Sequence, residues 1–493
     1  MHVRDNILTD IAWIHTVSGR KTVRDTLIHA HEPRMELDSN IAGFYFSAQL
    51  RFLTQVLAVI LRYTTLSAQE LRREGIPVDA VDKAIAMIDD GAHLRSGKYP
   101  FMQPNEDIPV TAKVKSLAKL PPSVPTANTE NFWNMTAIPE SLSVEDATLW
   151  VATYGIMAPC SNNTLNKELK LKAENGAPGF RFNLDKTPAE VIYEGNTLLT
   201  TLMFMTKKSW VKDESLPAWA DRVAEHGQGN LWRGSWMSNA VILEWNDDDE
   251  LISAGVGGIT KTSWYPQKDT HPAPKEWWDE RDKEDIFYQY YLKTSNKEED
   301  PKPQLAYFSV DETLTELSVQ WMTNTYPEVN HERVLNLSRP SVTLVQHDLS
   351  GTATTPKIYA SVVTRTDPTT WVVAENESSQ TLRVMKSMGK YINATSSALK
   401  YVIKNEDKLS ALETDLLYAF WSELDIKFRA LMLSARNEGT SVEDLYKKIR
   451  QVAFNAFDMV YESVALVDPA VTYGARSYLT GILFKKEKEL LEQ

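Results

Sequence analysis

A chain of 493 residues, 43% hydrophobic and 24% charged, is too long for a single hydrophobic core, so two or three globular domains are expected. The formal net charge of −13 excludes a protein that coats nucleic acid nonspecifically, although basic loops can still contact it locally. The single cysteine, Cys160, excludes an internal disulfide framework and a cysteine-rich zinc site, and it suits a reducing cytoplasm.

The beginning of the sequence gives no sign of export or membrane insertion. Met1 to Asp5 lack the charged-then-apolar pattern of a signal peptide. The longest apolar run, about Ile41 to Leu61, is interrupted by Gln49, Arg51 and Gln55, which favours a buried helix over a membrane span. We therefore expect a cytoplasmic protein that does not associate with membranes.

Up to about residue 365 the pattern mixes helices and strands irregularly. Ser39 is placed to cap a helix that runs to Ile60, and a second helix is expected over Val78–Ile88. Strand signals follow at Ala240–Leu243, Leu305–Phe308 and Lys357–Val363. The glycine-rich segment Gly255–Thr260 lies between strand-like runs, and the polar segment Pro266–Pro303 is typical of long loops or an insertion.

From about residue 370 the pattern is helical only. Apolar residues recur at spacings of three and four, on one helix face, at Leu409, Leu412, Leu416, Phe420, Leu424, Phe428 and Leu431. Candidate helix ends are the capping boxes Ser410/Glu413 and Thr440/Glu443, the stop Asn437-Glu438-Gly439, and the start Asp468-Pro469. With a helix over Ser378–Lys404, four helices are expected. The predicted fold class is α+β, with a large mixed α/β domain over residues 1–368 and a four-helix bundle over residues 369–493.

Candidate catalytic and metal-binding patterns are weak. His29-Ala30-His31 is not accompanied by HExxH or CxxC. His347-Asp348 resembles the metal-binding dipeptide of some phosphohydrolases, but it follows an apolar run and lacks partner ligands, which favours a strand end. No GxSxG, Walker loop or GxGxxG occurs. We expect no enzyme activity, no cofactor and no metal. A metal-dependent hydrolase centred on His347-Asp348 is the least favoured of the functions that we consider.

Three short fragments carry a family resemblance: Lys98-Tyr99-Pro100-Phe101-Met102-Gln103, Ala177-Pro178-Gly179-Phe180 and Arg233-Gly234-Ser235-Trp236. In order and approximate spacing they resemble the CasA family, the large subunit of the type I-E CRISPR surveillance complex Cascade. The resemblance covers essentially the whole chain. The family's architecture, a mixed domain before a four-helix bundle, agrees with the change from a mixed pattern to a helical pattern near residue 370.

The resemblance implies a non-catalytic subunit of an RNA-guided antiviral DNA-surveillance complex. Such a subunit recognises the short protospacer-adjacent motif (PAM) in duplex DNA and helps start strand separation, so that guide RNA can pair. It also helps recruit a helicase-nuclease after target binding. The implied partners are the other Cascade subunits, guide RNA and double-stranded target DNA.

The family reads the motif with a glycine loop, a lysine finger and a wedge, which map onto this sequence by resemblance. The glycine loop falls at residues 177–182, where Gly179 matches the first loop glycine and Phe180 follows it. Arg181 replaces a later glycine and can reach the groove or a phosphate instead. The lysine finger falls at Lys261, ten residues before His271-Pro272, with Lys268 as the alternative.

The wedge maps onto Arg339-Pro340-Ser341-Val342, and Pro340, Ser341 and Val342 all remain candidates for its tip. A loop over about residues 126–140 resembles the family loop that contacts the guide-RNA 5′ handle and neighbouring subunits, with Asn131, Phe132 and Trp133 as contact residues.

The resemblance further implies that the bundle contacts the displaced DNA strand, with the tip Lys485-Lys486-Glu487-Lys488 facing phosphate or a partner. The alternative function is a scaffold whose helical bundle docks a partner and which reads no DNA.

Overall fold

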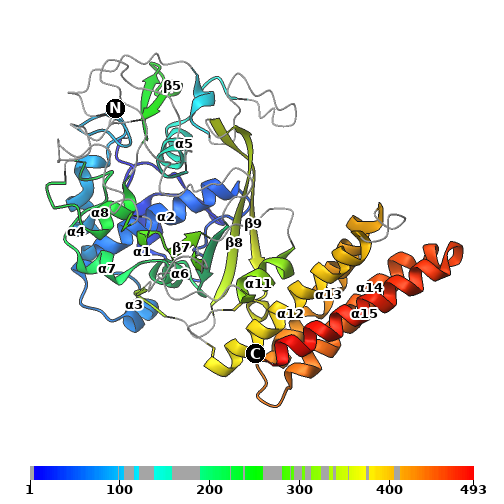
Figure 1. Cartoon of the computed structure of the whole chain (residues 1–493). Coiled ribbons are helices and arrows are strands. Elements are labelled where there is room, and N and C mark those ends of the chain that lie inside the picture. The colour runs from blue at the N-terminus through cyan, green and yellow to red at the C-terminus, as the bar shows by residue number, and fades with distance from the viewer. Residues whose placement is uncertain are drawn as a thin grey trace. The chain divides into compact units, whose positions relative to one another are not determined.

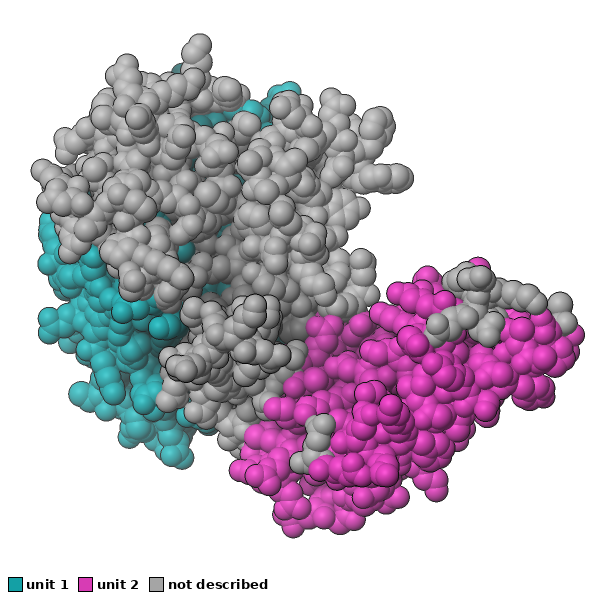
Figure 2. Space-filling view, viewed as in Figure 1, with its two compact units in different colours: residues 1–289, 305–310, 328–365 teal, residues 290–304, 311–327, 366–493 magenta. Residues whose placement is uncertain are grey.

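The computed structural model describes residues 5–97, 99–104, 116–121, 138–157, 189–222, 224–236, 239–258, 280–281, 283–288, 290–293, 302–305, 313–323, 332–336, 340–352, 355–372, 377–404 and 411–492. The chain divides into two compact units, shown in Figure 2. Unit 1 comprises residues 1–289, 305–310 and 328–365, and unit 2 comprises residues 290–304, 311–327 and 366–493. Unit 2 is therefore larger than the segment 369–493 predicted from the sequence, because two earlier segments join it.

Unit 1 combines helices with small sheets, so the predicted α+β class is confirmed (Figure 1). Within the described residues, its helices include α1 (Val23–Ile28), α2 (Gly43–Ile60), α3 (Ala68–Glu74), α4 (Val78–Ile88), α5 (Val144–Met157), α6 (Leu198–Phe204), α7 (Lys208–Lys212) and α8 (Asn230–Ser235). Its described strands pair as β1 (Ile14–Thr16) with β2 (Gly19–Lys21), β4 (Asn239–Trp245) with β5 (Leu251–Gly258), and a sheet in the order β3 (Glu190–Glu194), β8 (Ser341–Thr352), β9 (Thr355–Thr366). A further pair, β6 (Tyr290–Lys293) with β7 (Lys302–Leu305), lies almost entirely in unit 2. The predicted helix over Val78–Ile88 is confirmed as α4. Of the glycine-rich segment expected between strands, Gly255–Gly258 form the end of β5.

Helix α2 forms the centre of unit 1. Every residue of α2 except Tyr45 is buried, and α2 packs against α4, α5, α6 and β8 (Figure 1). The stretch Gly43–Tyr63 is long and apolar enough to cross a bilayer, but 94% of that stretch lies inside the protein. The interpretation as a buried core helix is therefore confirmed.

The predicted cap of α2 at Ser39 is wrong. The helix begins at Gly43, with Ala42 in the N-cap position and no side-chain cap, because Ser39 lies in a turn where the Asp38 carboxylate accepts from the Asn40 N–H. A Cβ atom at Gly43 would lie 2.6 Å from Ser361 Oγ, so glycine permits a close approach between the helix start and β9.

The sheet that contains β3, β8 and β9 packs on this core helix. Strands β3 and β8 are antiparallel, with Glu190 opposite Val345 and Glu194 opposite Ser341. On its other edge β3 meets the segment 285–288, where the Val191 N–H donates to the Phe287 carbonyl at 2.7 Å. The packing of α2 on β8 therefore ties this sheet to the centre of the unit.

Unit 2 contains the C-terminal helical bundle. Its helices α12 (Ser379–Lys404), α13 (Glu413–Ala435), α14 (Val442–Val467) and α15 (Pro469–Leu491) lie alongside one another in Figure 1. Helix α11 (Leu314–Thr323) packs on α12 and α13 within the same unit. The five apolar seam residues that lie within α13 are buried: Leu416, Phe420, Leu424, Phe428 and Leu431.

The helix ends of the bundle agree with the sequence in part. Asp468 accepts from the Val471 N–H at 3.4 Å and Pro469 follows it, so the predicted start of α15 is confirmed. The predicted capping box at Thr440 is wrong by one residue, because Ser441 is the N-cap and accepts from the Asp444 N–H. The N-cap position of α13 is occupied by Leu412 instead of Ser410.

Candidate nucleic-acid interface

Most residues predicted to contact nucleic acid lie outside the described part of the chain. These are Gly179, Phe180, Arg181, Lys261, Lys268, Arg339, Asn131, Phe132 and Trp133. Their assignment stays a prediction.

The predicted wedge residues Ser341 and Val342 lie at the start of β8. Ser341 is exposed and pairs with Glu194, whereas Val342 pairs with Tyr193 and is 1% exposed. Pro340 is also buried. A wedge that enters a base step must be reached by DNA, so the burial of Pro340 and Val342 argues against an apolar tip at these two positions. Ser341 is the wedge candidate that solvent reaches.

The fragment Pro100-Phe101-Met102-Gln103 is part of the core of unit 1. Phe101 is fully buried and makes edge contacts with Phe52 and Trp219. The guanidinium of Arg222 donates to the carbonyl oxygens of Pro100 and Gln103. Burial lowers the pKa of Arg222 to about 9, which still leaves it charged at neutral pH. The fragment therefore characterises a fold and is not a binding site.

The fragment Arg233-Gly234-Ser235-Trp236 is also structural. It forms the end of α8, where Ser235 Oγ donates to the Leu231 carbonyl and accepts from the Ala218 N–H at 2.8 Å. A Cβ atom at Gly234 would lie 2.8 Å from the Trp210 ring, so this position needs glycine for helix α8 to approach α7 closely.

A buried charge cluster, formed by Arg51, Glu190, Asp285 and His347, connects α2 with the sheet. Arg51 Nε donates to Glu190 Oε1 at 2.6 Å and Arg51 Nη1 donates to Asp285 Oδ2 at 3.0 Å. His347 Nε2 lies 3.3 Å from Glu190 Oε2. Exposed fractions run from 0% for Glu190 to 6% for Asp285, so these charges lie in a medium of low dielectric constant.

Opposing effects set the ionisation of Glu190. Burial alone raises its pKa, but Arg51 and then His347 more than offset burial, so the pKa of Glu190 lies below its ordinary value. The Arg51 guanidinium also lies 4.1 Å from the centre of the Phe287 ring, a cation–π distance. Arg51 and His347 thus stabilise the Glu190 carboxylate, and the Phe287 ring stabilises the Arg51 guanidinium.

The sequence carries one signal of the buried charge cluster, which the predicted sites did not include. Arg51 interrupts an otherwise apolar run, and a charge inside a buried helix needs partners. The two other interruptions also have partners. Gln49 Oε1 accepts from the His15 N–H at 2.5 Å, and Gln55 Oε1 accepts from the Trp219 indole at 2.8 Å.

The geometry around His347 does not resemble a hydrolase centre. Its two ring nitrogens lie 2.8 Å from Ser361 Oγ and 3.3 Å from Glu190 Oε2, and its ring is buried in β8. Within the ranges that the structure describes, no group of three or more His, Cys, Asp or Glu residues is placed to hold a metal ion. His347 therefore joins the charge cluster of the core.

Unit 2 carries a groove between α12 and α15, of about 650 Å³, which we call the tyrosine groove. Its lining includes Tyr401, Tyr478, Lys390, Lys485 and Lys486. The two tyrosine rings are 52% and 48% exposed and their centroids lie 6.0 Å apart. A hydrogen bond between them is the main cause that raises the pKa of Tyr478 above its ordinary value. Exposed aromatic faces beside lysines suit single-stranded nucleic acid.

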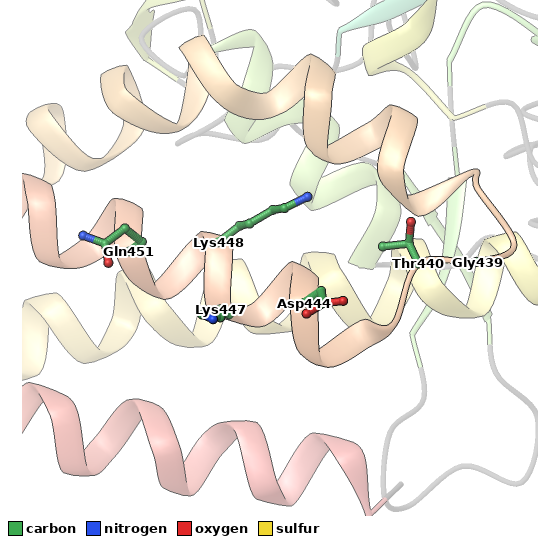
Figure 3. A pocket seen from close by; sticks show the side chains of 6 residues that line it. All are labelled: Gly439, Thr440, Asp444, Lys447, Lys448 and Gln451. Carbon is green, nitrogen blue, oxygen red and sulfur yellow. The ribbon is translucent and has the colours of Figure 1, made fainter.

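A second hollow of unit 2 lies at the turn between α13 and α14 and is lined by Gly439, Thr440, Asp444, Lys447, Lys448 and Gln451 (Figure 3). In Figure 3 the Lys448 side chain reaches toward α13, where its Nζ lies 3.4 Å from Ser434 Oγ. The Asp444 carboxylate on the same wall offsets part of the positive charge, as Glu489 does in the tyrosine groove, where it bonds to Lys486 at 2.7 Å. The hollow has two lysines and no tyrosine in its lining, against three lysines and two tyrosines in the groove, so it is the weaker candidate for a nucleic-acid contact.

Solved structures share this fold over nearly its whole length. Thermus thermophilus CasA (Cse1) matches with 16% identity and a TM-score of 0.66, covering 99% of this chain and 100% of that chain. Acidimicrobium ferrooxidans Cse1 matches with 15% identity and a TM-score of 0.66, covering 99% of each chain. A chain of a CRISPR RNA-guided surveillance complex matches with 16% identity and a TM-score of 0.65, again over 99% of each chain.

The mixed unit followed by a helical bundle is thus the fold of CRISPR-associated surveillance proteins. The chain belongs to the family described as CRISPR-associated protein Cse1, which matches residues 8–314, more than half of its length. The predicted resemblance to the CasA family is confirmed. A comparison with curated proteins gave no match.

Proposed function

We propose that this chain is the non-catalytic large subunit of a type I-E Cascade complex, and that it recognises a PAM in duplex DNA. The carrying observation is its membership of the Cse1 family together with a fold shared end to end with Cse1 proteins. In the cytoplasm it binds the other Cascade subunits and guide RNA, helps open the duplex beside the motif, and helps recruit a helicase-nuclease.

The charge of the chain is consistent with this role. A net charge of −13 is unsuited to binding DNA along a broad surface, so contact through a few loops is the arrangement that electrostatics favours. Reading a short motif in the minor groove needs only such local contacts, because guide RNA supplies the remaining sequence information. The proposed contacts are Gly179, Phe180, Arg181, Lys261 or Lys268, Arg339 and Ser341.

Either Lys261 or Lys268 is the proposed lysine finger, and replacing that residue by alanine is expected to weaken binding of target DNA by the assembled complex. If the side chain contacts a phosphate, the slope of log affinity against log salt should fall by about one. If it contacts base edges, the loss should be about 1–3 kcal/mol and depend on the flanking motif. The measurement is a salt series of DNA titrations with Lys261→Ala and Lys268→Ala complexes, the motif being chosen from a library with randomised flanks.

Lys83→Ala is the matched control, because Lys83 pairs with Asp79 on the exposed face of α4. It should change neither affinity nor slope. If unmodified complexes bind flanked and unflanked targets equally, the chain is a scaffold and does not recognise DNA.

The tyrosine groove supports contact between the bundle and the displaced strand. Replacing Tyr401 and Tyr478 together by alanine is expected to remove about 1–3 kcal/mol per stacked base. Nuclease footprinting of the displaced strand in the target-bound complex should show faster cleavage, with duplex recognition unchanged.

Two other exposed bundle tyrosines provide the control. Tyr418 and Tyr473 are 74% and 70% exposed and do not line the groove. Equal footprints for the two double variants would assign the displaced strand to a different surface.

A further inference from the structure

We infer that the buried charge cluster is a positioning element: it fixes β3, β8 and the segment 285–288 against one another, and motif discrimination by the complex depends on that arrangement. The inference rests on the proposed function. None of the four residues touches DNA in this role; each acts through the chain segment that it anchors.

The cluster connects three segments that lie side by side. Glu190 is the first residue of β3, Asp285 lies in the segment that meets one edge of β3, and His347 lies in β8 on the other edge. Arg51 donates to the carboxylates of Glu190 and Asp285 at once, and the Glu190 carboxylate also contacts His347. A single guanidinium on the central helix therefore fixes the relative position of all three segments.

Each of these segments follows one proposed DNA-reading element in the chain. Arg181 of the glycine loop lies nine residues before Glu190, and Ser341 lies six residues before His347. Lys261 lies 24 residues before Asp285, and the alternative Lys268 lies 17 residues before it. A shift of β3 against either neighbour would therefore move the anchor of one reading element relative to the others.

Stability alone does not account for charges in this position. Removing carboxylates and a guanidinium from water costs several kcal/mol per ion, and well-packed apolar residues of similar volume often give equal or greater stability. What a charge network adds is a specific arrangement, because hydrogen bonds are directional and apolar contacts are not. In a sheet this matters, since a one-residue slip turns every side chain to the opposite face.

Further contacts hold the cluster itself in one arrangement. Asp285 Oδ1 accepts from the Phe287 N–H at 3.0 Å, and the Phe287 ring lies against Arg51. Ser361 Oγ of β9 lies 2.8 Å from His347 Nδ1, which extends the network across the sheet. The imidazole therefore contacts polar groups on both sides, so one network links the relative positions of β3, β8 and β9.

The test measures motif discrimination, the ratio of affinities for duplex targets with and without the motif, in assembled complexes. Glu190→Gln and His347→Gln keep side-chain volume and some hydrogen bonding but change the charge network. In both, discrimination is expected to fall about tenfold, corresponding to about 1.4 kcal/mol. Affinity for a target already opened at the flank should stay unchanged, because guide pairing does not depend on the three segments.

Glu377→Gln is the matched control, because Glu377 forms a half-buried ion pair with Arg436 in unit 2. It should lower stability and leave discrimination intact, which separates positioning from a general structural effect. Unchanged discrimination in the assembled His347→Gln complex, the milder variant, would overturn the inference while leaving the proposed function in place. Absence of discrimination in the unmodified complex would overturn both.

Discussion

Arg51→Met is expected to lower the free energy of unfolding by about 3–5 kcal/mol at neutral pH. The substitution leaves Glu190 and Asp285 as buried carboxylates without their shared cation, since Arg51 bonds to both. The size of the effect comes from the uncompensated charges, and not from lost packing, because methionine fills most of the same volume. Urea denaturation of the full chain, followed by hydrogen exchange of α2 amides, measures it.

The loss should also shrink as the pH falls. The folded-state pKa of Glu190 in the native protein is below its ordinary value, so its stabilising contribution is complete above the unfolded-state pKa and is lost as the pH falls through the folded value. Without Arg51, burial raises the pKa of Glu190, and protonation then relieves the buried charge. The gap between native and variant proteins should therefore narrow from pH 7 toward about pH 4.

An exposed ion pair provides the control for this experiment. Arg24 bonds to Asp82 with Nε–Oδ1 at 2.7 Å, but the two side chains are 33% and 51% exposed to water. Arg24→Met should cost less than about 1 kcal/mol. Equal losses for the two variants, or a gap that widens on acidification, would contradict the assignment of Arg51 to a buried network.

Local signals in the sequence were sufficient to predict the bundle helices α13 and α15. The period of three and four along α13 and the Asp468-Pro469 start of α15 depend on residues within one or two helical turns, and both are confirmed. The cap at Thr440 was wrong by a single residue, because neighbouring Ser441 offers the same chemistry and the chain geometry selects between them. Such choices depend on how the helix enters the bundle.

The buried charge cluster could not be predicted in the same way. The partners of Arg51 lie 139 and 234 residues away along the chain, and no local pattern joins them. Only the isolated charge within an apolar run was visible, and it indicates that partners exist without naming them. The fragments that carry the family resemblance could be recognised from short local runs of sequence. Close packing restricts which residues fit at Phe101 and Gly234, and the same packing gives these residues a structural role.

Deleting residues 366–493 is expected to yield an aggregating fragment and not a clean N-terminal domain, because α11 belongs to unit 2. Leu317 is fully buried and Trp321 is 6% exposed within that unit. Trp321 stacks on Trp371 at 5.6 Å and donates to the Val372 carbonyl at 2.8 Å. Deletion removes these partners and exposes apolar side chains whose burial contributes about 1.5–3 kcal/mol each.

The matched fragment carries the same deletion together with Leu317→Gln and Trp321→Gln. These substitutions make the uncovered face of α11 polar without touching unit 1. Light scattering after size-exclusion chromatography should show large species for the simple deletion and a monomer for the substituted fragment. A monomeric simple deletion would mean that α11 finds cover within the N-terminal part, and the domain boundary would then lie near residue 368, as the helical pattern of the sequence alone predicts.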